Sequence, residues 1–351
     1  MTRTLYLHCG PAKTGTSAIQ AVLRSAPPPG LTYPATGQWS DGAHHKLVFA
    51  MRGQTARGTI DIPPFDTQLT ALAAELDAAP GDVVISSEAL TPQDVMPFMT
   101  HLRGALTHAF DDIRAIVTLR HPLERAASAY NQNLKDMTVD RVPMPVPYLE
   151  RNGANFCLMP QVRAWQWLPL PVSFLAYAPA DTLVQRFLDL IGHAPAAPLD
   201  RARHNRSING FGLVTLLAAR QAGLTPAHRI ALFQRLRNGD PRSIWAGASF
   251  PFPPQPSRSF ITTHVQPDLA DVKRLTGITL PDRLQDLPQR FHLTPEEAAE
   301  IRDLILPHPE AAPHATRLDN VLRHFTMQNR TSPAQNRAGQ GAGRRPTPPL
   351  G

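Results

Sequence analysis

The sequence predicts an α/β fold in which a central parallel sheet is flanked by helices and followed by a helical C-terminal extension. Through about the first 195 residues, short apolar and β-branched runs alternate with segments of helical periodicity, as in parallel strands joined by helices. The first run leads directly into a glycine-containing turn and a helix start. Beyond residue 195 the pattern indicates helices joined by loops, and the 351-residue chain has 37 prolines.

The first strand is expected at residues 5–9, where apolar side chains alternate. Gly10 ends it, and Thr14 or Thr16 is expected to cap the helix that follows. A strand, a glycine turn and a helix N-terminus in this order form a cradle for an anion, because backbone N–H groups and the helix dipole point into the turn. The side chains at this turn are one cation and three hydroxyls: Lys13, Thr14, Thr16 and Ser17. We therefore expect a phosphate site in a P-loop-type fold.

The spacing of this turn separates two kinds of phosphate loop. In nucleoside triphosphatases a lysine and then a serine or threonine follow the second glycine. Here Gly15 is followed by Thr16, and Lys13 lies two residues before Gly15. The stretch Ala-Lys-Thr-Gly-Thr-Ser instead resembles the 5′-phosphosulfate loop of the sulfotransferases that use 3′-phosphoadenosine 5′-phosphosulfate (PAPS).

The resemblance implies roles for the residues of the loop. Lys13 would contact the oxygen that bridges phosphate and sulfate, and the 5′-phosphate would be bound by the four residues after it: Thr14, Gly15, Thr16 and Ser17. Cytosolic members of the family often place next a tryptophan that stacks on adenine, but this chain has Ala18. Something else must therefore hold the base.

A second stretch matches the same family. Residues 113–119 are expected to form a central strand, and Pro122 suits the first turn of the next helix. Sulfotransferases bind the 3′-phosphate with an arginine at the end of such a strand and a serine eight residues later. Arg120 and Ser128 have that spacing. The resemblance covers the organisation of about residues 4–191 and is specific at the two motifs only.

Glu88 is the first candidate for the catalytic base. It follows an expected strand at residues 82–87, and ligands of open parallel sheets bind at the carboxyl ends of strands. Cytosolic sulfotransferases have a catalytic histidine at this place, and other branches use glutamate. Glu88 could do the same work if burial raises its pKa, with His45 as the alternative base; a purely structural carboxylate is the competing interpretation.

The other elements are expected as follows. Strands are predicted at 31–34 and 172–177, and helices at 44–50, 65–79, 94–108, 122–135, 159–168, 181–191, 208–222, 226–238, 267–275 and 294–306. Residues 136–153 are rich in proline and are expected to be irregular. The α/β core should span 1–195, a helical and loop-rich extension of the same domain 196–326, and a disordered tail 327–351. A basic cluster at 201–206 could complete the 3′-phosphate site.

Composition limits the partners. The formal charge of +7 includes four arginines in the tail, which weakly favours anionic ligands and gives no argument for nucleic acid. The two cysteines form no disulfide or zinc pattern, and no secretory leader or transmembrane run is present, so we expect a cytoplasmic protein.

The resemblance at the two motifs implies a PAPS-dependent sulfotransferase that moves a sulfuryl group to an acceptor hydroxyl. No metal is expected, because the leaving group carries one phosphate. The acceptor is open; a bacterial glycan is suggested by analogy of fold alone. The alternatives are a P-loop nucleotide-dependent kinase or triphosphatase and a non-catalytic nucleotide-binding module.

Overall fold

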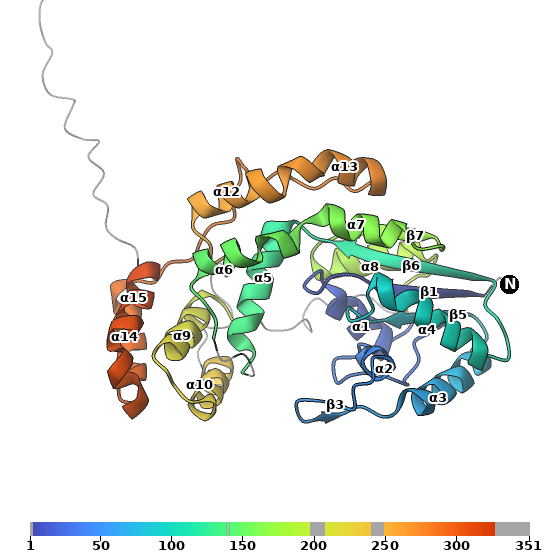
Figure 1. The fold of residues 1–351 in the computed structure, drawn as a ribbon, viewed down its shortest axis with the longest axis horizontal. Helices are drawn as coiled ribbons and strands as arrows, with labels where there is room; N and C mark the ends of the chain where they lie inside the picture. The colour runs from blue at the N-terminus through green and yellow to red at the C-terminus, as the bar shows by residue number, and fades with distance from the viewer. Residues whose placement is uncertain (1–2, 138, 140, 197–207, 240–248, 327–351) are drawn as a thin grey trace, which may run out of the picture.

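A computed structural model describes residues 3–137, 139, 141–196, 208–239 and 249–326. The predicted fold class is confirmed: five parallel strands form a sheet in the order β2-β5-β1-β6-β7, with helices around it (Figure 1). The strands are β1 (Thr4–Cys9), β2 (Leu31–Thr32), β5 (Asp82–Ser86), β6 (Asp112–Leu119) and β7 (Val172–Ala176). A separate two-stranded hairpin consists of β3 (Ala56–Arg57) and β4 (Ile60–Asp61).

The central strand is β1, and its position explains where the site lies. All six of its residues are buried, as expected for a strand covered on both faces. It pairs with β5 on one side and β6 on the other, with Leu7 opposite both Ile85 and Ala115. The chain completes the β2–β5 side and then crosses to β6, so the order reverses at β1. Ligands of open α/β sheets bind at the carboxyl ends of the strands beside such a reversal.

Helices cover both faces of the sheet. On one face, α1 (Thr16–Ser25) and α8 (Ala180–Leu190) share a core with inward side chains such as Tyr6 and Ile116. The other face, with Leu7 and Val117, packs in one core with α3 (Phe65–Ala78), α4 (Pro92–Ala105) and α7 (Leu158–Gln166). A short helix, α2 (His45–Met51), begins beside the end of β5.

A third core belongs to the C-terminal helices. Figure 1 shows α9, α10, α14 and α15 grouped away from the sheet, with α5 between them and the strands. The helices that contribute to this body are α5 (Pro122–Lys135), α6 (Pro145–Asn152), α9 (Gly210–Gln221), α10 (Pro226–Gly239), α12 (Pro254–His264), α14 (Pro295–Ile305) and α15 (Ala315–Phe325). The helix α13 (Gln266–Thr276) packs on α7, and η1 (Gly153–Phe156) and η3 (Pro309–His314) are short 3₁₀ helices.

The expectation of irregular structure through 136–153 is wrong in its second half, where α6 forms. Pro145 lies at the first helical position and Pro147 in the first turn, where a missing N–H removes no intrahelical hydrogen bond. Tyr148 and Leu149 then bury the helix against α5 and α12. The predicted tail at 327–351 and the basic cluster at 201–206 lie outside the described residues. Among the described residues, no helix combines the length and apolar character that crossing a bilayer requires.

Candidate active site

The loop between β1 and α1 has the backbone of an anion cradle. Three of its residues are left-handed, with φ of 119° at Gly10, 71° at Lys13 and 88° at Gly15. A Cβ on Gly15 would lie 2.6 Å from Leu183 Cδ2, so both the backbone angle and the available space favour glycine. Gly15 is the N-cap of α1. The N–H of Ala18 donates to the carbonyl of Gly15 at 3.1 Å, and those of Thr16 and Ser17 before it are the helix-end donors that an anion at the loop could use.

The hydroxyls of the loop do not cap α1, so the predicted cap at Thr14 or Thr16 is wrong. The buried Thr14 Oγ1 donates to the carbonyl of Pro11 at 2.8 Å and braces the loop from inside. Thr16 Oγ1 donates to Glu88 Oε1. Ser17, half-buried, lies on the same first turn. The hydroxyls of Thr14 and Thr16 are therefore already engaged within the protein.

Lys13 lies where the loop meets α5. Its Nζ donates to Gln132 Oε1 at 3.3 Å. Burial lowers the pKa of Lys13, and the negative charges of Glu88 and Asp41 offset part of that effect. An anionic ligand at the loop would stabilise the charged ammonium further.

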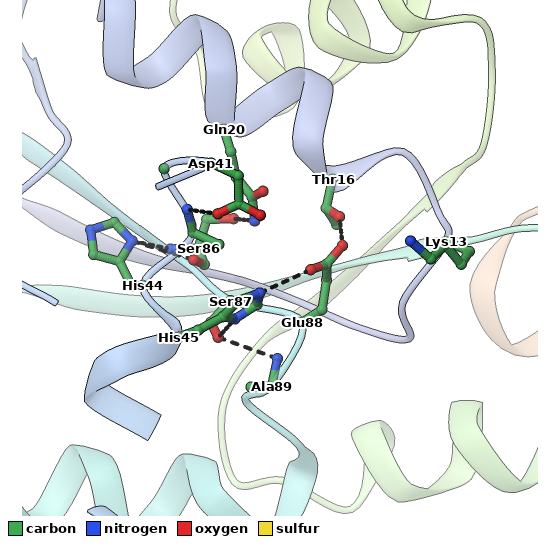
Figure 2. Close-up of polar contacts among 12 residues, drawn as sticks. Lys13, Thr16, Gln20, Asp41, His44, His45, Ser86, Ser87, Glu88 and Ala89 are labelled. Carbon is green, nitrogen blue, oxygen red and sulfur yellow. Dashed lines mark hydrogen bonds and ion pairs between the residues drawn. The ribbon is translucent and has the colours of Figure 1, made fainter. Parts of the chain in front are cut away.

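Glu88 and His45 form a joined pair at the end of β5 (Figure 2). Glu88 Oε2 lies 3.3 Å from His45 Nε2, while Oε1 accepts the hydrogen bond of Thr16. The second ring nitrogen of His45, Nδ1, lies 2.8 Å from Ser87 Oγ. The carboxylate thus connects the anion loop to α2, and the imidazole is held at both of its nitrogens.

The pKa of Glu88 shifts opposite to the expected direction. Burial raises it, but the hydrogen bonds from His45 and Thr16 and the charges of His45 and Lys13 together outweigh burial and hold the pKa below its ordinary value. The carboxylate is therefore ionised at neutral pH, and its ability to accept a proton depends on its position more than on high basicity.

Arg120 and Ser128 line the same pocket, of about 420 Å³, beside the loop. Arg120 is tied to the loop, because its Nη1 donates to the carbonyl of Lys13 at 3.1 Å. The Cζ atom of its guanidinium lies 4.1 Å from the centre of the Tyr177 ring, in a cation–π contact. Its Nε lies 3.6 Å from Glu124 Oε2. The structure therefore brings together the two motifs that the sequence places about a hundred residues apart.

Two further cations of this pocket were not predicted. Arg283, from the segment after α13, bonds Glu124 Oε1 at 2.7 Å, so Glu124 bridges Arg120 and Arg283. Lys135, at the end of α5, has its pKa lowered to about 8 by burial and by the charge of Lys13. No sequence motif surrounds Arg283; only the packing of the C-terminal segment on α5 places it here.

The adjacent histidines have separate environments. His44 is buried, and its Nε2 lies 2.8 Å from the carbonyl oxygen of Pro34. We interpret His44 as a structural residue. Among the described residues, the group whose ligand atoms could jointly hold a metal lies elsewhere, on α10 and at the start of η3, where His308 is the N-cap: His228, His308 and Glu310, with these atoms within 4.8 Å of one another. That the reaction requires no metal stays a prediction.

Comparisons with known proteins give limited information. No protein-family model matches the chain, and no curated protein matches it. Among solved structures, it is similar to the mouse sulfotransferase SULT7A1 complexed with PAP, with 11% sequence identity and a TM-score of 0.34 over 78% of this chain and 82% of the mouse chain. A likeness this weak supports no conclusion about chemistry, which has to be argued from the site itself.

Proposed function

We propose that this protein is a PAPS-dependent sulfotransferase that transfers the sulfuryl group to an acceptor hydroxyl. The observation that carries the proposal is the contact between the anion loop and the Arg120 pocket. Arg120 lines that pocket and also bonds the backbone of Lys13. A ligand with one anionic group in the loop and a second near Ser128 fits this arrangement, and PAPS carries anionic groups at its 5′ and 3′ ends.

The 3′-phosphate would be bound in the pocket by Arg120 and Ser128, with Arg283 and Lys135 adding positive charge. Arginine can hold a phosphate through paired charge-assisted hydrogen bonds. In the structure, the carboxylate of Glu124 forms ion pairs with both Arg120 and Arg283. A phosphate would compete with Glu124 for these donors.

The 5′-phosphosulfate would lie on the first turn of α1, with Lys13 beside the bridging oxygen. The acceptor oxygen forms a bond to sulfur while the bond from sulfur to the bridging oxygen breaks, and the electron pair leaves on the 5′-phosphate. Lys13 stabilises the charge that develops there. The acceptor proton passes to Glu88, which His45 and Thr16 hold in place.

His45 is the alternative base. Its Nε2 faces Glu88 and its Nδ1 faces Ser87, so both nitrogens already have partners, whereas a carboxylate retains free lone pairs after two hydrogen bonds. This favours Glu88 as the proton acceptor and His45 as the residue that positions it. A glycan acceptor stays part of the proposal by analogy of fold.

A thermal-shift series tests the assignment. Adenosine 3′,5′-bisphosphate (PAP) should raise the melting temperature in the presence of EDTA, since binding to the folded state alone stabilises it. ATP with magnesium should have a smaller effect at the same concentration. Stabilisation by ATP with magnesium but not by PAP would instead select a kinase or triphosphatase.

A further inference from the structure

A second pocket, of about 640 Å³, lies at the far end of α5 from Arg120. Its walls come from the segment before α6, from α6 itself, from the α9–α10 turn and from α15. Five arginines line it: Arg141, Arg151, Arg220, Arg229 and Arg317. Among the described residues that line it there is no aspartate or glutamate.

Two of these arginines are buried and build the wall. Arg220 donates to the carbonyls of Leu134 at 3.2 Å and Asp136 at 2.6 Å, and also to the carbonyl of Val139. Arg229 Nη1 donates to the same Val139 carbonyl at 3.4 Å. These bonds fix the end of α5 and the segment after it, so the two arginines act as the structural base of the pocket.

The other three arginines are exposed and come from three different places in the chain. Arg141 precedes α6, Arg151 lies in its last turn, and Arg317 belongs to α15. None of the three forms an ion pair with an acid among the described residues. Next to the lining residue Thr225, Glu310 Oε1 lies 2.5 Å from His228 Nδ1 and accepts from Thr225 N at 3.4 Å.

Arg141, Arg151 and Arg317 bring three like charges to one pocket, and a bound anion lowers the cost of their repulsion. Guanidinium groups match the oxygens of sulfate and phosphate through paired hydrogen bonds. The pocket is wide and its cations come from separate elements, which favours a ligand with more than one anionic group. The described lining residues include no Phe, Tyr, Trp or His, so they offer no platform on which nucleobases could stack.

We propose that this pocket binds an oligoanion that bears two or more sulfate or phosphate groups, through Arg141, Arg151 and Arg317 over the base formed by Arg220. The ligand could be an acidic oligosaccharide or an inorganic oligophosphate, since both present the same tetrahedral groups. The proposal is independent of the donor chemistry at the Arg120 pocket.

Titration calorimetry on the full chain at fixed ionic strength tests this, with three probes: a heparin-derived hexasaccharide, sodium tripolyphosphate and an oligothymidylate. The test variant carries Arg141→Gln, Arg151→Gln and Arg317→Gln. The matched control carries Arg103→Gln, Arg163→Gln and Arg186→Gln, which removes the same charge from exposed positions on α4, α7 and α8. Melting temperatures confirm that both variants fold.

We expect the hexasaccharide, the tripolyphosphate or both to bind the parent, and the test variant to bind them at least roughly 10-fold more weakly. The control should stay close to the parent. Binding of the saccharide alone would identify a glycan ligand, and binding of tripolyphosphate alone a free phosphate ligand. Three results overturn the proposal: no binding of either probe, an equal loss in test and control variants, or tighter binding of oligothymidylate than of both.

Discussion

At the scale of single residues, the arrangement around Glu88 decides how the site can work. The carboxylate contacts Thr16 of the anion loop through one oxygen and His45 of α2 through the other. These contacts hold its pKa low despite burial. If Glu88 is the base, as proposed, it would gain its effect from its orientation toward the acceptor, because proton transfer needs a donor within hydrogen-bond reach.

Replacing Glu88 by glutamine should lower kcat by roughly 10²–10⁴-fold, because the amide keeps the shape but cannot accept the proton. PAP affinity should change little. Steady-state rates and calorimetry on Glu88→Gln, with Glu150→Gln on the exposed face of α6 as the control, provide the comparison. A small effect on kcat with a large drop in melting temperature would show a structural carboxylate.

The pH profile of the parent gives an independent check on the same residue. Because the pKa of Glu88 is depressed, the carboxylate is ionised above it, and activity should be lost only as pH falls through that lowered value. The acid limb of kcat/KM should therefore lie below the ordinary glutamate pKa of about 4.3. His45→Gln should move the limb to higher pH, because the charge of His45, which lowers the pKa of Glu88 against the effect of burial, is then removed. A limb above pH 6 in the parent would contradict a carboxylate base.

Lys13 is expected to act mainly in the transition state. Lys13→Ala should reduce kcat by roughly 10²–10³-fold, the usual cost of removing one group that stabilises developing negative charge. PAP affinity should fall much less, since the N–H groups of α1 and the Arg120 pocket are retained. Lys273→Ala on the exposed face of α13 is the control. Turnover near the parent value in Lys13→Ala would remove Lys13 from the mechanism.

At the scale of elements, the loop and α1 depend on one glycine. Gly15 is left-handed, and any side chain there would collide with Leu183 of α8. Gly15→Ala should lower the free energy of unfolding by about 1–3 kcal/mol, through backbone strain and overpacking. Gly104→Ala, in α4 with open space around it, should be neutral or stabilising by up to about 1 kcal/mol. Urea unfolding of both variants checks this, and equal stability of Gly15→Ala and the parent would contradict it.

The sheet elements were predictable because their signals are local. β1 and β6 are buried apolar runs bounded by residues that end strands, and their bounds agree with expectation to within a residue or two. The helix α6 was missed because a run of prolines normally indicates a loop. Prolines fit a helix only in its first turn, and the sequence does not show that the helix begins at Pro145. The cap of α1 was missed because both threonine hydroxyls bond other groups, a choice that depends on tertiary contacts such as Glu88.

At the scale of the whole molecule, the candidate site is built both from the sheet and from the C-terminal part of the chain. The loop and Glu88 belong to the sheet, while the wall of the Arg120 pocket includes Phe250 and Arg283 from the C-terminal part of the chain. The sequence predicts the first set by motif. The second set has no motif, and only the packing of residues more than a hundred positions apart brings Arg283 to Glu124.

The central claim is that this molecule recognises a nucleotide by its 3′-phosphate. A hydrogen bond to a charged group contributes about 1.5–3 kcal/mol, so losing one weakens binding by roughly 10- to 150-fold. PAP should therefore bind the parent more tightly than adenosine 5′-monophosphate by at least that factor. Arg120→Ala should remove most of the difference and leave monophosphate binding nearly unchanged, because Lys13 and the first turn of α1 remain.

Titration calorimetry of both ligands against the parent, Arg120→Ala and a control gives the affinities needed. The control is Arg274→Ala, which removes an exposed arginine paired with Asp271 on α13 and should behave as the parent does. The predicted result is a preference for PAP that is present in the parent and the control and lost in Arg120→Ala. Equal affinity of the parent for PAP and adenosine 5′-monophosphate would contradict the sulfotransferase assignment.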